Sequence, residues 1–228
     1  MIDQILFGVF PYVAVALAIA VGCFRYAIDR YSWSSQSSQF LESRALYWGS
    51  VPWHYAILLI LLAHLLAFLF PAGWGTLLGE PARLYFLEVT GMVFGVTTVI
   101  AMLLLIVRRG MDPRLAVVTS RIDWLLLVLL LVQVATGVMI AISLRWGGVW
   151  YLHNAVPWLR SLVLLQPDVQ HLAVLPVVVK LHAFNAFLLI AVFPFSRLVH
   201  VVSVPLSYLS RPYQVVVWYR ERRRQAGI

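Results

Sequence analysis

Five apolar stretches, each about 20 residues long, recur along this 228-residue chain. A helix of about 20 apolar residues is long enough to cross the roughly 30 Å of hydrocarbon in a bilayer. The stretches cover approximately residues 5–24, 47–70, 84–107, 122–144 and 174–202. We therefore predict an all-α fold, a membrane bundle of five transmembrane helices forming one domain over residues 1–228.

The composition supports a membrane protein. Hydrophobic residues make up 62% of the chain and charged residues 11%, whereas soluble domains carry about 25% charged residues. The single cysteine, Cys23, excludes an intrachain disulfide and a metal site made only of cysteines.

The arginines in the gaps between the stretches predict the orientation. The first and third gaps are rich in arginine, the second holds only Arg83, and the C-terminal tail is strongly basic. Because basic loops stay in the cytoplasm, we expect the N-terminus outside and the C-terminus in the cytoplasm. The same rule explains the net charge of +8 better than nucleic-acid binding does.

Four of the six histidines lie inside the predicted spans, at depths where ionisable side chains are costly and usually functional. His54 and His64 belong to the second span, and His182 and His200 to the fifth. The second span is predicted to run from the inner to the outer face, and the fifth in the opposite direction. Antiparallel packing would therefore pair His54 with His200 near the inner face and His64 with His182 near the outer face.

The spacing of these histidines requires a tilted or bent helix. At about 1.5 Å per residue, His182 and His200 are separated by roughly 27 Å, and His54 and His64 by roughly 15 Å. Pro194, between His182 and His200, is a candidate for a bend.

Two imidazoles from facing helices are typical axial ligands of a b-type haem. The chain contains no C-x-x-C-H motif, so covalent attachment is not expected. A zinc site would need a third or fourth ligand. An iron with both axial positions filled is suited to electron transfer.

The four histidines also allow other interpretations. They could be hydrogen-bonded between helices, or they could form a proton relay in a transporter or channel. The remaining histidines, His153 and His171, fall in the fourth gap, and we expect them at the surface.

Haem propionates need cationic partners, and two basic residues lie close to the fifth-span histidines. Lys180 is two residues from His182, and Arg197 is three residues from His200. We expect both to bind propionates, although long basic side chains also reach the headgroups from within a span.

The stretch "FPFSRLVHVVSVPLSYLSRPYQ", residues 193–214, resembles the gamma subunit of membrane-bound respiratory nitrate reductase, a dihaem cytochrome b. The resemblance covers nearly the whole chain. Four further stretches occur in the same order as in that family: "PYVAVA", "RYSWSSQSSQFLESR", "WHYAILLILLAH" and "KLHAFNAFLL".

The resemblance implies two haems b, held by His54 with His200 and by His64 with His182. It also implies that menaquinol or ubiquinol is oxidised near the outer haem, in the inner membrane of a prokaryote. Electrons would then pass to an iron–sulfur (beta) subunit and a molybdenum-containing catalytic (alpha) subunit on the cytoplasmic side.

One position departs from the family pattern. The family has a lysine linked to the quinol pocket near the start of the third span, and the equivalent position here falls near Leu84. The adjacent Arg83 is the candidate donor to a quinol oxygen, or it anchors the helix at the surface. The sequence also allows a related cytochrome b that serves another iron–sulfur, molybdenum or heterodisulfide-type partner.

Overall fold

The computed structural model describes residues 1–29, 44–144 and 146–202, and within these ranges the chain is helical, without a strand. Five helical segments are long and apolar enough to cross a membrane. They are Ile2–Ile28, Ala45–Leu69, Pro81–Met111, Arg121–Ser143 and Val177–Phe195. The predicted all-α fold is confirmed for the described residues, and so is the presence of five helices that could span a membrane.

The first span comprises a short helix α1 (Ile2–Gln4), a π-helical turn η1 (Ile5–Val9) and α2 (Phe10–Ile28). The next three spans are α3 (Arg44–Leu69), α5 (Pro81–Met111) and α7 (Arg121–Ser143). The fifth is α11 (Val177–Val192), followed by the 3₁₀ turns η4 (Phe193–Phe195) and η5 (Arg197–Val201). Short helices connect the spans: α4 (Pro71–Leu78), α6 (Pro113–Val117), α8 (Gly147–Trp150), η3 (Tyr151–Ala155), α9 (Val156–Val163) and α10 (Gln170–Ala173).

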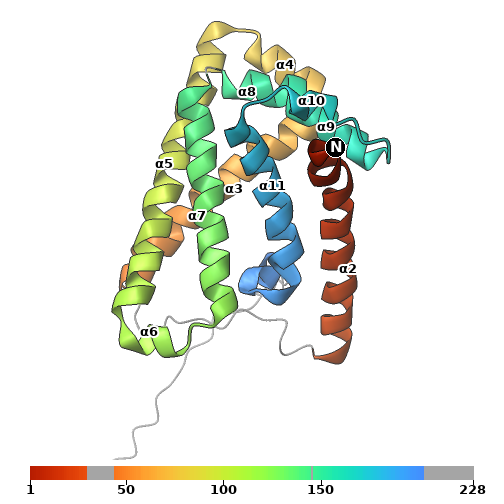
Figure 1. The fold of residues 1–228 in the computed structure, drawn as a ribbon. Helices are drawn as coiled ribbons and strands as arrows, with labels where there is room; N and C mark the ends of the chain where they lie inside the picture. The colour runs from red at the N-terminus through yellow and green to blue at the C-terminus, as the bar shows by residue number, and fades with distance from the viewer. Residues whose placement is uncertain (30–43, 145, 203–228) are drawn as a thin grey trace, which may run out of the picture.

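Figure 1 shows the arrangement of the spans. The helices pack in the order α3, α5, α7, α11 and α2, and α3 crosses obliquely behind α7. The N-terminus, α4 and α8–α10 lie at one end of the bundle, here called the N-terminal end, and α6, η4 and η5 lie at the other, the α6 end. Because α3 runs toward the N-terminal end and α11 runs away from it, the two histidine-bearing helices are antiparallel.

Local sequence signals set the helix boundaries. Pro71, Pro81 and Pro113 begin α4, α5 and α6, where a missing backbone N–H costs nothing. Ser120 Oγ accepts from the backbone N–H of Asp123, and the Asp123 carboxylate accepts from the N–H of Ser120, which forms a capping box at the start of α7.

The fifth span differs from its predicted extent of 174–202. As an α-helix it covers only Val177–Val192, and the chain then continues in 3₁₀ turns around Pro194. Proline lacks a backbone N–H and clashes with the preceding turn, so the α-helical pattern ends there. His200 therefore lies on η5 and not on the helix that carries His182.

The fourth gap forms a folded cap over the N-terminal end of the bundle. Trp158 is 2% exposed, packs edge-on against Phe7 and donates from its indole N–H to the Phe7 carbonyl at 3.0 Å. The Tyr12 hydroxyl donates to the Leu162 carbonyl at 2.9 Å. These contacts fix the cap to the start of the first span.

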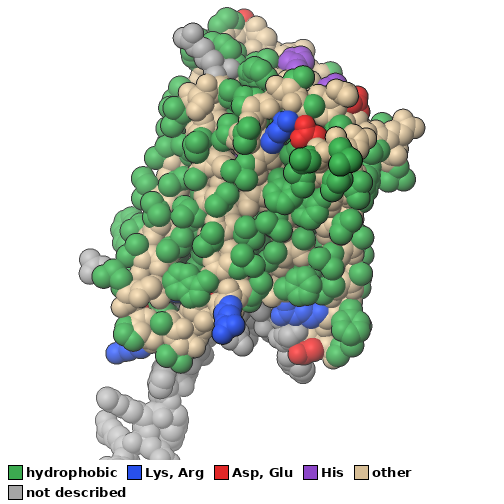
Figure 2. Space-filling model, in the orientation of Figure 1, with side chains coloured by type: hydrophobic (Ala, Val, Ile, Leu, Met, Phe, Trp, Pro, Cys, Tyr) green, Lys and Arg blue, Asp and Glu red, His purple; other side chains and the backbone are tan. Residues whose placement is uncertain are grey.

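Figure 2 shows a largely hydrophobic surface. Hydrophobic side chains cover the middle of the face in view, and charged side chains gather mostly toward the two ends. A membrane-spanning bundle has this distribution, because its outer surface meets lipid and not water.

Candidate functional site

His54 on α3 and His200 on η5 face each other, although they are far apart in the sequence. Their ring centroids are 6.1 Å apart and the ring planes meet at 63°. Two metal–nitrogen bonds of about 2 Å, together with the ring radii, place the centroids of two axial imidazoles roughly 6 Å apart. The separation of this first pair therefore matches two imidazoles on opposite sides of one metal ion.

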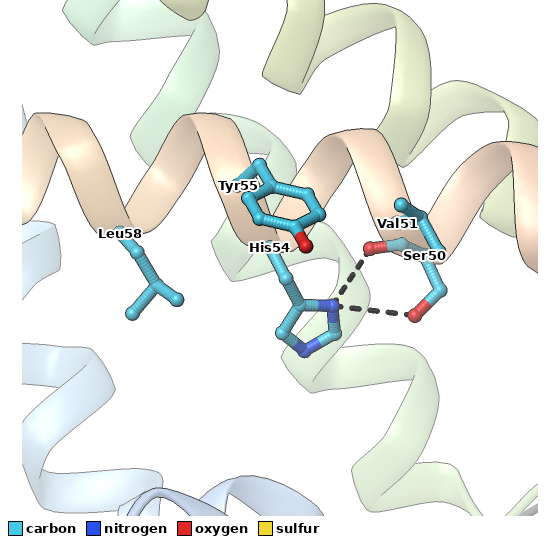
Figure 3. Close-up of a pocket in the computed structure, with 5 residues that line it drawn as sticks. All are labelled: Ser50, Val51, His54, Tyr55 and Leu58. Carbon is cyan, nitrogen blue, oxygen red and sulfur yellow. Dashed lines mark hydrogen bonds between the residues drawn. The ribbon is translucent and has the colours of Figure 1, made fainter.

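Hydrogen bonds fix the tautomer of both rings in the first pair. His54 Nδ1 lies 2.7 Å from the Ser50 carbonyl oxygen and 3.2 Å from Ser50 Oγ, and His200 Nδ1 lies 2.6 Å from the Arg197 carbonyl oxygen. A carbonyl only accepts, so Nδ1 carries the proton and Nε2 keeps its lone pair. Figure 3 shows the other ring nitrogen of His54 pointing away from α3. Metal-bound histidines commonly have this arrangement.

A cavity of about 410 Å³ opens beside His54. It is lined by Ser50, Val51, His54, Tyr55 and Leu58 (Figure 3). Over the described residues, α3 packs on α5 and makes no close packing with α11. All five lining residues belong to α3, so the cavity gives open space beside the His54 side of the first pair.

The second predicted pair is His64 on α3 and His182 on the antiparallel helix α11. His64 repeats the pattern of the first pair, because its Nδ1 lies 2.8 Å from the Ile60 carbonyl oxygen. His182 differs. Its Nδ1 lies 3.0 Å from Thr136 Oγ1, and its Nε2 lies 3.1 Å from the side-chain nitrogen of Gln133. The Gln133 amide must withdraw before His182 Nε2 can bind a metal.

Tyr151 contacts the second pair from the cap. Its ring centroid is 4.7 Å from that of His64, and its hydroxyl donates to the His64 carbonyl at 3.1 Å. Burial raises the pKa of Tyr151 to about 12, so the hydroxyl is protonated at neutral pH. Sequence reasoning missed this residue, because nothing in the fourth gap distinguished one tyrosine from the other aromatic residues there.

Sequence reasoning also missed three polar residues around His182, namely Gln133, Thr136 and Asn185. Asn185 Nδ2 donates to the Leu129 carbonyl at 2.9 Å and to Gln133 Oε1 at 2.8 Å. Polar side chains inside otherwise apolar spans are the signal that identifies them from the sequence.

The three predicted cationic residues all have partners within the chain. Lys180 Nζ forms an ion pair with Asp3 at 2.9 Å, and Arg197 Nε forms one with the buried Asp123 at 2.7 Å. Arg83 is exposed near the start of α5, and its guanidinium lies 3.3 Å from the Thr76 carbonyl oxygen. These contacts are structural, and the propionate and quinol roles stay predictions.

The two remaining histidines lie outside both pairs. His153 is exposed, and the His171 ring lies 3.7 Å from the Asp168 carboxylate at the surface of the cap. Within the described parts of the chain, no three His, Cys, Asp or Glu side chains gather in one place. The candidate site therefore consists of the two histidine pairs.

Comparisons with known proteins give one consistent family. The family model described as "Nitrate reductase gamma subunit" matches residues 3–219. The nitrate reductase gamma chain of Bacillus subtilis is 33% identical over 97% of this chain and 100% of its own length. The respiratory nitrate reductase 1 gamma chain of Escherichia coli is 32% identical over 94% of this chain and 97% of its own length. The nitrate reductase-like protein NarX of Mycobacterium tuberculosis is 31% identical over 97% of this chain, but over only 34% of its own length.

Proposed function

The chain belongs to the nitrate reductase gamma subunit family, and from this premise we propose that it is a dihaem cytochrome b that oxidises quinol for a nitrate reductase. The family is a membrane cytochrome b component. The chain is accordingly an oxidoreductase subunit of the inner membrane, and its partners include the catalytic and other subunits of the complex.

The geometry of the first pair is the observation that supports the haem assignment. His54 and His200 face each other at a centroid separation of 6.1 Å, and each has its Nδ1 beside a backbone carbonyl. A haem b held between them would supply one-electron exchange at its iron. The chain itself orients both rings through their Nδ1 hydrogen bonds, and the mostly apolar residues beside His54 would tune the potential of a bound haem.

We assign the second haem to His64 and His182, where the ring of Tyr151 packs against His64, and Gln133 and Thr136 of α7 contact His182. Lys180 and Arg197 are the proposed partners of the propionates. Each would bind a propionate while also paired with a carboxylate of the chain, Asp3 for Lys180 and Asp123 for Arg197.

We further propose that the N-terminal end of the bundle is the outer end. Quinol is then oxidised near the second pair with release of protons outside, and Arg83 is the candidate hydrogen-bond donor to a quinol oxygen. The iron–sulfur and molybdenum subunits would bind on the cytoplasmic side, close to the first pair. The exposure of Arg83 at the N-terminal end supports its assignment.

The proposal is tested by adding menaquinol or ubiquinol to the purified full-length chain and recording the visible difference spectrum. We expect reduced b-type haem bands, formed more slowly in Arg83→Gln. Arg160→Gln, which changes another exposed arginine at the same end, is the matched control and should reduce at the wild-type rate. A colourless protein, or haem bands that do not respond to quinol, would contradict the proposal.

A further inference from the structure

One of the four histidines is held differently from the other three. The Nδ1 atoms of His54, His64 and His200 lie beside carbonyl oxygens three or four residues earlier in the chain. The Nδ1 of His182 lies instead 3.0 Å from the side-chain hydroxyl of Thr136, on the neighbouring helix α7. Thr136 is 5% exposed, so water does not compete strongly for this contact.

The neighbours of Thr136 determine which group donates in this hydrogen bond. Thr136 Oγ1 lies 2.7 Å from the Val132 carbonyl oxygen and 3.0 Å from the Gln133 carbonyl oxygen. Carbonyls only accept, so the single hydroxyl proton points toward them. Oγ1 is then the acceptor and His182 Nδ1–H the donor, which leaves the lone pair of this ring on Nε2.

The backbone of α7 also limits the space available to the His182 ring. A Cβ atom added at Gly137 would lie 3.3 Å from His182 Cε1 and 3.8 Å from His182 Nδ1. Because a contact of 3.3 Å is tight, a side chain at position 137 would press on the ring. The hydroxyl of Thr136, the side-chain nitrogen of Gln133 and the bare backbone of Gly137 together fix the position and rotation of His182 in this structure, and the Thr136 contact is the one that holds Nδ1.

We propose that Thr136 is a positioning residue that orients His182 and, through its hydroxyl, sets the reduction potential of the haem held by the second pair. This inference rests on the proposed function. A histidine whose Nδ1–H donates a hydrogen bond is a more basic ligand, and a more basic ligand favours the oxidised metal. The hydroxyl that accepts this bond is itself polarised, because it donates to a carbonyl. A helix that supplies no axial ligand thereby controls one of the two haems.

The test uses Thr136→Val, which keeps the shape of the side chain and removes the hydroxyl. We expect both haems to stay bound, the potential of the second-pair haem to become more positive, and that of the first-pair haem to stay unchanged. Thr136→Ser restores the hydroxyl and should return the potential toward the wild-type value. Potentiometric titration of the full-length chain in membranes, followed by visible absorption, measures both haems, and a His54→Ala background identifies the second-pair haem.

Thr98→Val is the matched control. Thr98 is also a fully buried threonine inside a span, and its hydroxyl donates at 2.6 Å to the Gly95 carbonyl of its own helix, α5. Its substitution removes a hydroxyl of the same kind without touching the His182 contact, so both potentials should stay at their wild-type values.

The outcomes separate the two proposals. If Thr136→Val retains both haems at unchanged potentials, the inference is wrong and the proposed function stands. If the wild-type chain binds no haem, the proposed function itself is wrong. If Thr136→Val loses the second-pair haem, Thr136→Ser decides: retention of that haem supports the role of the hydroxyl, and loss in both variants overturns it.

Discussion

The two histidine pairs share α3, but their second members lie on different elements, η5 for His200 and α11 for His182, and the pairs are supported in different ways. In the first pair, each Nδ1 lies beside a backbone carbonyl within four residues, and the His54 ring borders a cavity. In the second pair, His182 depends on Thr136 and Gln133 of α7, and His64 is covered by Tyr151 of the cap. The first pair is thus oriented by its own local backbone, and the second by tertiary packing.

This difference shows that the approach of two histidines and the environment of each ring are encoded by different residues. Histidine spacing and helix direction are enough to bring two rings together. The tuning of a ring requires contacts from other helices, and only the second pair has side-chain partners of this kind among the described residues.

The largest expected effect comes from removing the proposed axial ligands. His200→Ala should abolish the first-pair haem, and His182→Ala the second-pair haem, each leaving about half of the b-type absorbance because each haem needs two histidines. Visible spectra of the purified variants measure this loss. His153→Ala, a histidine outside both pairs, should retain the full spectrum. Retention of both haems in either ligand variant would refute the pairing.

The second-largest effect is expected from Asp123→Asn, which should weaken haem binding at the first pair and not at the second. Asp123 is 3% exposed and pairs with Arg197, whose carbonyl orients His200. Asp123→Asn leaves the guanidinium without its buried counter-charge, at an expected cost of about 3 kcal/mol in the free energy of unfolding. We expect weakened binding of the first-pair haem, measured by haem content after purification.

Asp3→Asn is the matched variant at the opposite end of the bundle, because it breaks the ion pair with Lys180. It should leave the first-pair haem intact. If both Asp3→Asn and Asp123→Asn lost the first-pair haem equally, the ion pair of Asp123 with Arg197 would not be what positions η5.

Gly137→Val should affect the second pair alone. The added side chain would press on the His182 ring, and overpacking of this kind costs about 1–3 kcal/mol. We expect a shifted potential or reduced occupancy of the second-pair haem only, measured by redox titration. Gly91→Val is the control, since a Cβ at Gly91 meets no atom within 4 Å. A change at the first-pair haem in Gly137→Val would contradict the separation of the two pairs.

The smallest effect should come from Tyr151→Phe. The variant keeps the ring against His64 and removes the hydroxyl that donates to the His64 carbonyl, at a cost of about 0.5–1.5 kcal/mol. We expect a slightly lower thermal unfolding temperature with both haems retained, measured by following the absorbance of bound haem on heating. Loss of the second-pair haem would mean that Tyr151 has a larger role than support.

Much of the fold follows from the sequence, because the length and polarity of the apolar stretches fix five spans. The ring centroids of His54 and His200 lie 6.1 Å apart in an edge-on arrangement, and their role as a haem-binding pair stays a prediction. Pro194 marks the position where the α-helical part of the fifth span ends, although the extent of the 3₁₀ turns was not predictable from it.

The environment of the site was not predictable to the same degree. The contact between Thr136 and His182 depends on how α7 and α11 align, and periodicity does not specify this alignment. The ion pair of Lys180 with Asp3 joins residues at opposite ends of the described chain. The folded cap was also not predicted. Its helices are short and only partly apolar, so its sequence resembles that of an ordinary loop between spans.

The ratio of haem b to polypeptide in the purified full-length chain, produced with ample haem supply, tests the central claim most directly. The two proposed histidine pairs predict two noncovalently bound haems in each molecule. A ratio below one would show that opposing imidazoles in this bundle do not hold porphyrin iron, and the account given for both ends of the molecule would then be incorrect.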